Sequence, residues 1–125
     1  MERILIFEQA RGNREKLERD VRSRLDAIGI RHVEFLYFIP GDVFSNPLPD
    51  TARAAFFTLG SMYDVEAACH FNKLRKRIPV VIVSDSEQYC QEGYNFAVYY
   101  LLRPFTWEDL GKALSKCGFW VPRAN

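Results

Sequence analysis

The chain has 125 residues, 48% of them hydrophobic and 26% charged, which is typical of one globular domain rather than of a disordered or fibrous chain. Seventeen lysines and arginines balance sixteen acids, a net charge of +1 that excludes the strong field of a nucleic-acid-binding or membrane-surface protein. No apolar run approaches the roughly 20 residues that span a bilayer, and three scattered cysteines without a CxxC motif argue against a disulfide framework, so we expect one cytoplasmic domain over residues 1–125.

The first half of the chain alternates between strand and helix patterns. The short apolar run at 3–7 predicts a strand that is covered on both faces. Apolar residues at helical spacing predict an amphipathic helix over 13–28, which ends at Gly29. A second strand is expected at 32–39, whereas the prolines in 42–52 leave room only for a short or broken second helix.

The second half repeats this alternation. The predicted elements are a strand at 54–59, a helix at 63–77, a strand at 80–83, a short helix at 86–93, a strand at 98–102 and a last helix that begins after Thr106 and reaches Cys117. Thr106 followed by Asp109 resembles a capping box. Five strands that alternate with helices predict an α/β fold, a three-layer α/β/α sandwich around a five-stranded parallel sheet.

Three segments of the second half carry a family resemblance. Pro79 to Tyr89 (PVVIVSDSEQY), Glu92 to Tyr94 (EGY) and Tyr100 to Phe105 (YLLRPF) resemble CheY-like response-regulator receiver domains, especially those that precede LytTR-type DNA-binding domains. The first half resembles the family in pattern only. The resemblance implies the flavodoxin-like topology with strand order 2-1-3-4-5.

The resemblance also places the family's phosphorylation site on this chain. The acidic pair that holds a divalent cation falls on Glu8 and Gln9, the phosphoacceptor aspartate on Thr58 or Leu59, the strand-four hydroxyl on Ser84, the lysine-proline pair on Arg103 and Pro104, and the aromatic switch residue on Tyr100.

The missing carboxylates matter chemically. Magnesium needs several oxygen ligands, usually with carboxylate charge among them, and neither Thr58 nor Leu59 can form an acyl phosphate. We therefore expect no aspartyl phosphorylation, no catalytic residue, no metal site and no cofactor. Arg103 could form a permanent ion pair with Glu8, or it could point to solvent.

Aromatic residues are concentrated in the segment from 86 onward. The set comprises Tyr89, Tyr94, Tyr99, Tyr100, Phe105, Trp107, Phe119 and Trp120. Aromatic clusters left on a surface are commonly interfaces, so we expect self-association or partner binding through the 86–117 face, led by Tyr99, Tyr100, Trp107, Tyr89 and Tyr94. The alternative is that most of these rings fill the core and that Trp120 packs back onto the last helix.

The sequence supports three functions. The first is a pseudo-receiver, a binding module that signals without phosphate control by contacting a protein partner or a second copy of itself as a homodimer. The second is a phosphorylatable receiver of a two-component system or phosphorelay, cut from a LytTR-type regulator. The third is a flavodoxin-like domain that binds a small molecule at the carboxyl ends of its strands. In all three readings we expect no membrane association and no direct nucleic-acid binding by this domain.

Overall fold

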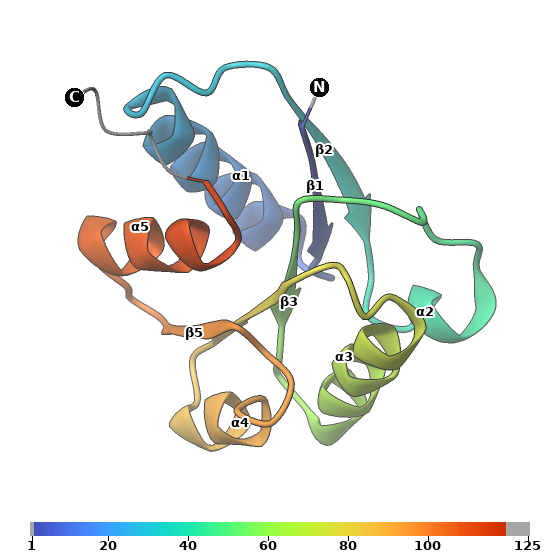
Figure 1. Cartoon of the computed structure of the whole chain (residues 1–125). Coiled ribbons are helices and arrows are strands. Elements are labelled where there is room, and N and C mark those ends of the chain that lie inside the picture. The colour runs from blue at the N-terminus through green and yellow to red at the C-terminus, as the bar shows by residue number, and fades with distance from the viewer. Residues whose placement is uncertain (1, 120–125) are drawn as a thin grey trace.

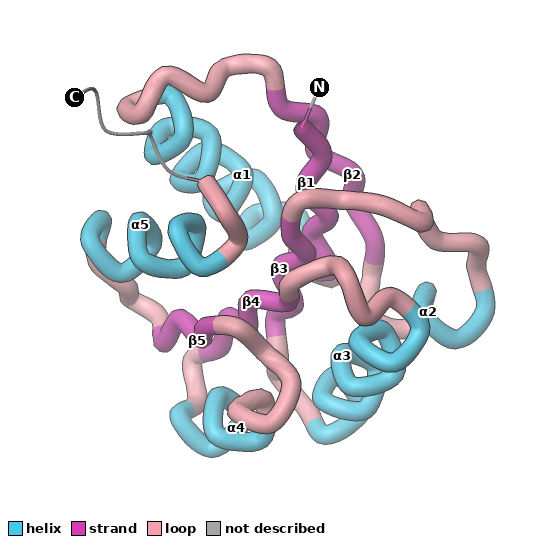
Figure 2. The backbone as a smooth tube through the Cα atoms, viewed as in Figure 1, coloured by secondary structure: helices cyan, strands magenta, loops and turns pink. Residues whose placement is uncertain are grey.

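The computed structural model describes residues 2–119, and its ten elements follow the expected alternation (Figures 1 and 2). The strands are β1 (Glu2–Phe7), β2 (Val33–Phe38), β3 (Ala54–Thr58), β4 (Val80–Ser84) and β5 (Tyr99–Leu102). The helices are α1 (Arg11–Asp26), α2 (Asp42–Ser45), α3 (Met62–Leu74), α4 (Glu87–Glu92) and α5 (Trp107–Lys116). All neighbouring strands are parallel and their order is β2-β1-β3-β4-β5, which confirms the predicted sheet.

The helices cover the sheet in two layers, as Figure 1 shows. Helices α1 and α5 lie over one face, and their core includes Ile6, Val21, Phe56, Val83 and Leu114. Helices α2, α3 and α4 lie over the other face, and their core includes Phe7, Phe57, Leu59, Phe71 and Ile82. Because successive residues of a strand face opposite sides, each strand contributes alternate side chains to the two cores.

The central strands are buried along their whole length. Every residue of β3 and β4 is buried, which explains why their sequences, AAFFT and VVIVS, show little polar alternation. Three aromatic rings pack together in the core under α2, α3 and α4. Phe7 stacks on Phe57 with ring centroids 4.0 Å apart, and Phe71 meets Phe7 edge-on at 5.2 Å.

The structure moves several predicted boundaries by a few residues. Helix α1 begins two residues earlier than expected, and it ends at Asp26 rather than at Ile28, before Gly29 takes a positive φ of 83°. Helix α3 ends at Leu74 and not at Arg77, because Arg75 leaves the helical conformation and donates to the carbonyls of Leu48 and Pro49.

The predicted short second helix and the predicted helix cap are both confirmed. Helix α2 has only four residues before the chain becomes extended at Asn46. At α5 the Thr106 hydroxyl accepts from the Asp109 amide, and the Asp109 carboxylate accepts from the Thr106 amide. Across residues 2–119, the chain has no helix of the length and apolar character that crossing a membrane requires.

Candidate functional site

The carboxyl ends of three strands contribute side chains to one hollow at the edge of the sheet. Glu8 follows β1, Thr58 ends β3 and Arg103 follows β5, and all three line one open hollow of about 510 Å³. The remaining lining residues are Gln9, Ala10, Asn13, Pro40, Gly60, Ser61, Tyr63 and Asp64. The carboxyl edge of a parallel sheet is where open α/β folds bind their ligands, so this hollow is the candidate site.

Glu8 is an unusually buried carboxylate, with only 5% of the residue exposed. Its Oε2 accepts from the amide of Ala10 at 3.0 Å. Its Oε1 lies 3.5 Å from Nη1 of Arg103, which is an ion pair, although the geometry is not that of a hydrogen bond and Oε1 has no other partner. Gln9, the next residue, is exposed on the rim of the hollow.

Arg103 bridges two carboxylates. Besides its contact with Glu8, its Nε and Nη2 donate to the two carboxylate oxygens of Asp85 at 3.0 and 3.2 Å. This is the bidentate fork that guanidinium and carboxylate groups favour. Arg103 therefore does not point freely to solvent, and its side chain is only 23% exposed. Pro104 follows it through a cis peptide bond and is exposed.

Thr58 and Leu59 face opposite sides of the sheet. The Thr58 side chain lines the hollow, and its hydroxyl is buried without a hydrogen-bond partner. The Leu59 side chain is 1% exposed and belongs to the core under α3 and α4. Of the two residues, Thr58 is thus the one whose side chain lies beside Glu8 and Arg103.

Ser84 is placed at the end of β4, but its hydroxyl is committed to the backbone. Ser84 Oγ donates to the carbonyl of Leu59 at 2.6 Å and accepts from the amide of Ser86 at 3.1 Å. The residue is 1% exposed and does not line the hollow. Through these two hydrogen bonds, Ser84 links Leu59, the residue after β3, to the start of the β4–α4 loop.

Two further acids lie at or beside the hollow, Asp64 in α3 and Asp85 directly after β4. Asp64, in the first turn of α3, lines the hollow and accepts from the amide of Gly60 at 2.8 Å. Ser61 caps the same turn through the amide of Asp64, and a Ser-x-x-Asp spacing is the signal that could have located this turn. Asp85 is the second acid, as the partner of Arg103.

The residues around the hollow do not fit a divalent cation. Magnesium prefers octahedral oxygen ligands with carboxylate charge. Here one carboxylate, Glu8, already faces the positive charge of Arg103, and the Asp64 carboxylate accepts from a backbone amide. Within residues 2–119, no group of three or more His, Cys, Asp or Glu side chains is arranged to hold a metal ion.

A second feature is a set of exposed aromatic residues, Tyr94, Tyr100 and Trp107. Tyr94 and Tyr100 lie together and form what we call the tyrosine face, whereas the Trp107 ring lies 4.9 Å from the guanidinium of Arg24 on α1. The three aromatic residues are 51%, 41% and 51% exposed, respectively. The Tyr94 and Tyr100 rings lie 4.9 Å apart, and hydrogen bonding with Tyr100 raises the pKa of Tyr94 to about 12. The expectation that some rings of this segment are exposed is therefore confirmed for these three.

Other rings of the segment are partly or wholly internal. Tyr99 and Phe105 are half-buried against the core under α1 and α5, and Tyr89 is half-buried against the opposite core. Phe119 is buried, with the guanidinium of Arg53 4.8 Å from its ring centroid. Trp120 lies outside the described residues.

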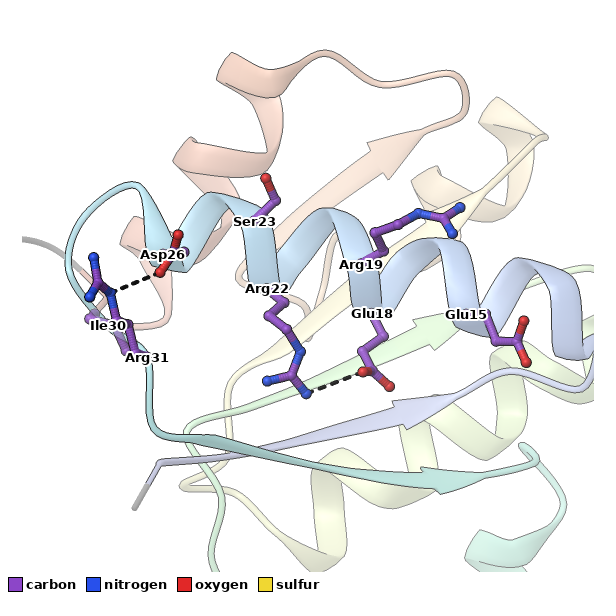
Figure 3. Close-up of a pocket in the computed structure, with 8 residues that line it drawn as sticks. All are labelled: Glu15, Glu18, Arg19, Arg22, Ser23, Asp26, Ile30 and Arg31. Atoms are coloured by element: carbon purple, nitrogen blue, oxygen red, sulfur yellow. Dashed lines mark hydrogen bonds and ion pairs between the residues drawn. The ribbon is translucent and has the colours of Figure 1, made fainter.

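A second hollow runs along α1 and is lined mostly by charged side chains (Figure 3). Arg22 pairs with Glu18 at 3.1 Å and Arg31 pairs with Asp26 at 3.0 Å, so most of the charge is compensated locally. Such i,i+4 and near-neighbour pairs are typical of a solvated helix face. We assign no site to this surface.

Comparison with known proteins finds similarity at the level of structure only. No protein-family model matches the sequence, and no curated protein matches it. A protein from Burkholderia thailandensis named for pilus assembly (CpaE) matches with a TM-score of 0.76 and 16% identity, over 94% of this chain and 98% of its own.

Two receiver proteins give similar matches. The response regulator TrrA from Thermotoga maritima, solved with Mg²⁺ and BeF, matches with a TM-score of 0.70 and 16% identity, over 94% of this chain and 99% of its own. A CheY-like receiver domain from Methanospirillum hungatei matches with a TM-score of 0.62 and 19% identity, over 94% and 97%. This chain therefore has the CheY-like fold of response-regulator receiver domains.

Proposed function

We propose that this chain is a pseudo-receiver, a signalling module that binds a protein partner or a second copy of itself without control by aspartyl phosphorylation. The observation that carries the proposal is the position of Arg103. Its guanidinium lies between Glu8 and Asp85 at the edge of the sheet where the family assembles its phosphorylation site. The positive charge in the hollow is therefore that of the Arg103 side chain, and Thr58 stands in place of an acceptor carboxylate.

The chemistry of phosphoryl transfer supports this assignment. Transfer to a receiver requires a carboxylate nucleophile and a metal ion that neutralises the charge on the transferring group. A threonine hydroxyl cannot form an acyl phosphate, and the fixed charge of Arg103 opposes the entry of a divalent cation beside Glu8. Ser84 is also held by Leu59 and Ser86, which leaves its hydroxyl no spare proton to donate to a phosphate.

The tyrosine face supports binding as the mode of action. Val98, just before β5, and Leu102, its last residue, are 38% and 40% exposed and extend the apolar surface. An exposed apolar and aromatic surface is more typical of a binding site than of a free monomer surface. Since one similar structure is named for pilus assembly, components of such a machine are one class of partner to test.

Phosphate uptake is the decisive experiment. The wild-type chain is incubated with acetyl phosphate and magnesium, and its intact mass is measured. We expect no phosphoryl adduct and magnesium binding no tighter than roughly millimolar. A variant that restores the family's residues, with Gln9→Asp, Thr58→Asp and Arg103→Lys, serves as the comparison. A stable adduct on the wild type that is lost in Asp64→Asn would contradict the proposal and favour the phosphorylatable receiver.

Association is tested separately by sedimentation of the wild type. Tyr100→Ala and Trp107→Ala are expected to weaken self-association or partner binding, whereas Tyr37→Ala, 42% exposed on the opposite edge strand β2, is the matched control. We select Tyr100 over Tyr99 because Tyr99 packs against the core. If the chain is monomeric at high concentration and both variants keep every partner contact, the tyrosine face is not the binding surface.

A small molecule that copurifies with the chain would instead favour the ligand-binding alternative.

A further inference from the structure

Helix α4 is a short helix that packs against β4, β5 and α3. It contains six residues, Cys90 is the one that is fully buried, and its N-cap residue Ser86 makes no side-chain hydrogen bond to the helix. A helix of this length is not stable in isolation, so its position depends on packing and on the loop that precedes it. Gly93, which follows α4, lies close to Ile82 of β4 and anchors its far end.

The near end of α4 is held by side chains from other elements. Ser84 Oγ accepts from the amide of Ser86, and the Asp85 carboxylate accepts both bonds of the Arg103 fork. Arg103 in turn contacts Glu8, which follows β1. Strands β1 and β4 are separated by β3 in the sheet, so this Glu8–Arg103–Asp85 bridge joins segments that the sheet does not pair directly.

We propose that Arg103 is a positioning residue that tethers the β4–α4 loop to the end of β1 and thereby holds α4, and the tyrosine face beside it, in a single position. The proposal rests on the proposed function in one respect, since it treats the tyrosine face as the binding surface. It assigns the chain a constitutive binding state, because the tether is made of its own side chains and needs neither metal nor phosphate.

The two ion pairs of the tether, Arg103 with Asp85 and Arg103 with Glu8, differ in exposure, so they should respond differently to salt. The Asp85 side chain is 77% exposed, whereas the Glu8 side chain is 7% exposed. Salt screens exposed charges much more strongly than buried ones. High salt is therefore expected to loosen the outer contact, between Arg103 and Asp85, and to leave the inner contact with Glu8 in place.

Amide hydrogen exchange across residues 85–93 tests the tether. Arg103→Met is expected to accelerate exchange there by about fivefold or more and Asp85→Asn by about two- to fivefold, while residues 62–74 of α3 keep the wild-type rate. Arg103→Lys, which retains the charge but loses the fork, is expected to fall between wild type and Arg103→Met. The matched controls are Asp26→Asn and Arg31→Met, which break an equally short but remote ion pair.

A salt series completes the test. Raising the salt concentration from about 0.05 M to about 1 M is expected to accelerate exchange at 85–93 in the wild type and to have little effect in Arg103→Met. Unchanged exchange at 85–93 in both Asp85→Asn and Arg103→Met would overturn the tether, as would an equal acceleration along the whole chain. These outcomes are distinct from failure of the proposed function, which phosphate uptake by the wild type would reveal.

Discussion

Replacing Arg103 with methionine removes the positive charge beside a buried carboxylate. Glu8 is 5% exposed and Arg103 Nη1 is the cationic group at 3.5 Å from its Oε1. Breaking a buried ion pair on one side typically costs 3–5 kcal/mol, and we expect about 2–3 kcal/mol here, because Arg103 is partly exposed and Glu8 keeps its bond from Ala10. Asp85→Asn should cost less than about 1 kcal/mol, since Asp85 is mostly exposed.

A double-mutant cycle isolates the pair. Glu8→Gln removes the buried charge, so Arg103→Met should be less costly by about 1–2 kcal/mol in that background than in the wild type. Urea unfolding followed by circular dichroism measures each variant. With a slope of about 2 kcal/mol per molar urea, the midpoint of Arg103→Met should fall by roughly 1 M or slightly more. A loss below about 0.5 kcal/mol, or an equal loss with and without the Glu8 charge, would refute the ion-pair reasoning.

Three further predictions concern the elements that frame the site. Gly93→Ala should destabilise the chain by about 1–3 kcal/mol in urea unfolding, since a Cβ would lie 2.6 Å from Ile82 Cγ1; Gly12→Ala, where a Cβ meets nothing within 4 Å, is the control and should be neutral or stabilising. Thr106→Ala should cost about 1 kcal/mol by loss of the α5 cap, with Ser115→Ala as the exposed control, and equal losses would argue against the cap. Burial raises the pKa of the Cys117 thiol from 9.0 to about 12, so alkylation at pH 8–9 should label half-exposed Cys69 first. Because the pKa of Cys117 is higher in the folded state than in the unfolded state, the thiol does not reduce the free energy of unfolding below pH 9. The free energy of unfolding falls as the pH rises from 9 to about 12, and denaturation across that range measures the fall.

The fold could be predicted because its signals are local. Apolar runs marked the central strands, a period of 3.6 residues marked α1 and α5, and Pro47 with Pro49 limited the second helix. The ends of helices were less accurate, since they depend on tertiary contacts. The end of α3, for example, is set by the bonds of Arg75 to a distant loop, which no pattern in the helix itself encodes.

The site could be predicted only in part. The contact of Arg103 with Glu8 was one of two open alternatives, and the choice between Thr58 and Leu59 required the register of β3. The partnership of Arg103 with Asp85 was missed, because an exposed acid 18 residues away gives no local signal. The register supplies the reason: Ser84 pairs with Leu102, so the residues that follow them leave the sheet side by side.

The contacts of Arg53 have a practical consequence for experiments on this chain. Arg53, before β3, donates to Glu2 at 3.1 Å and to the carbonyl of Gly118 beyond α5. Both described ends of the chain are therefore gathered at the amino edge of the sheet, whereas Glu8 and Arg103 lie at the carboxyl edge. A support attached near either of these described ends would lie at the amino edge, so the access of a phosphodonor or small molecule to the hollow can be measured on immobilised protein without obstruction.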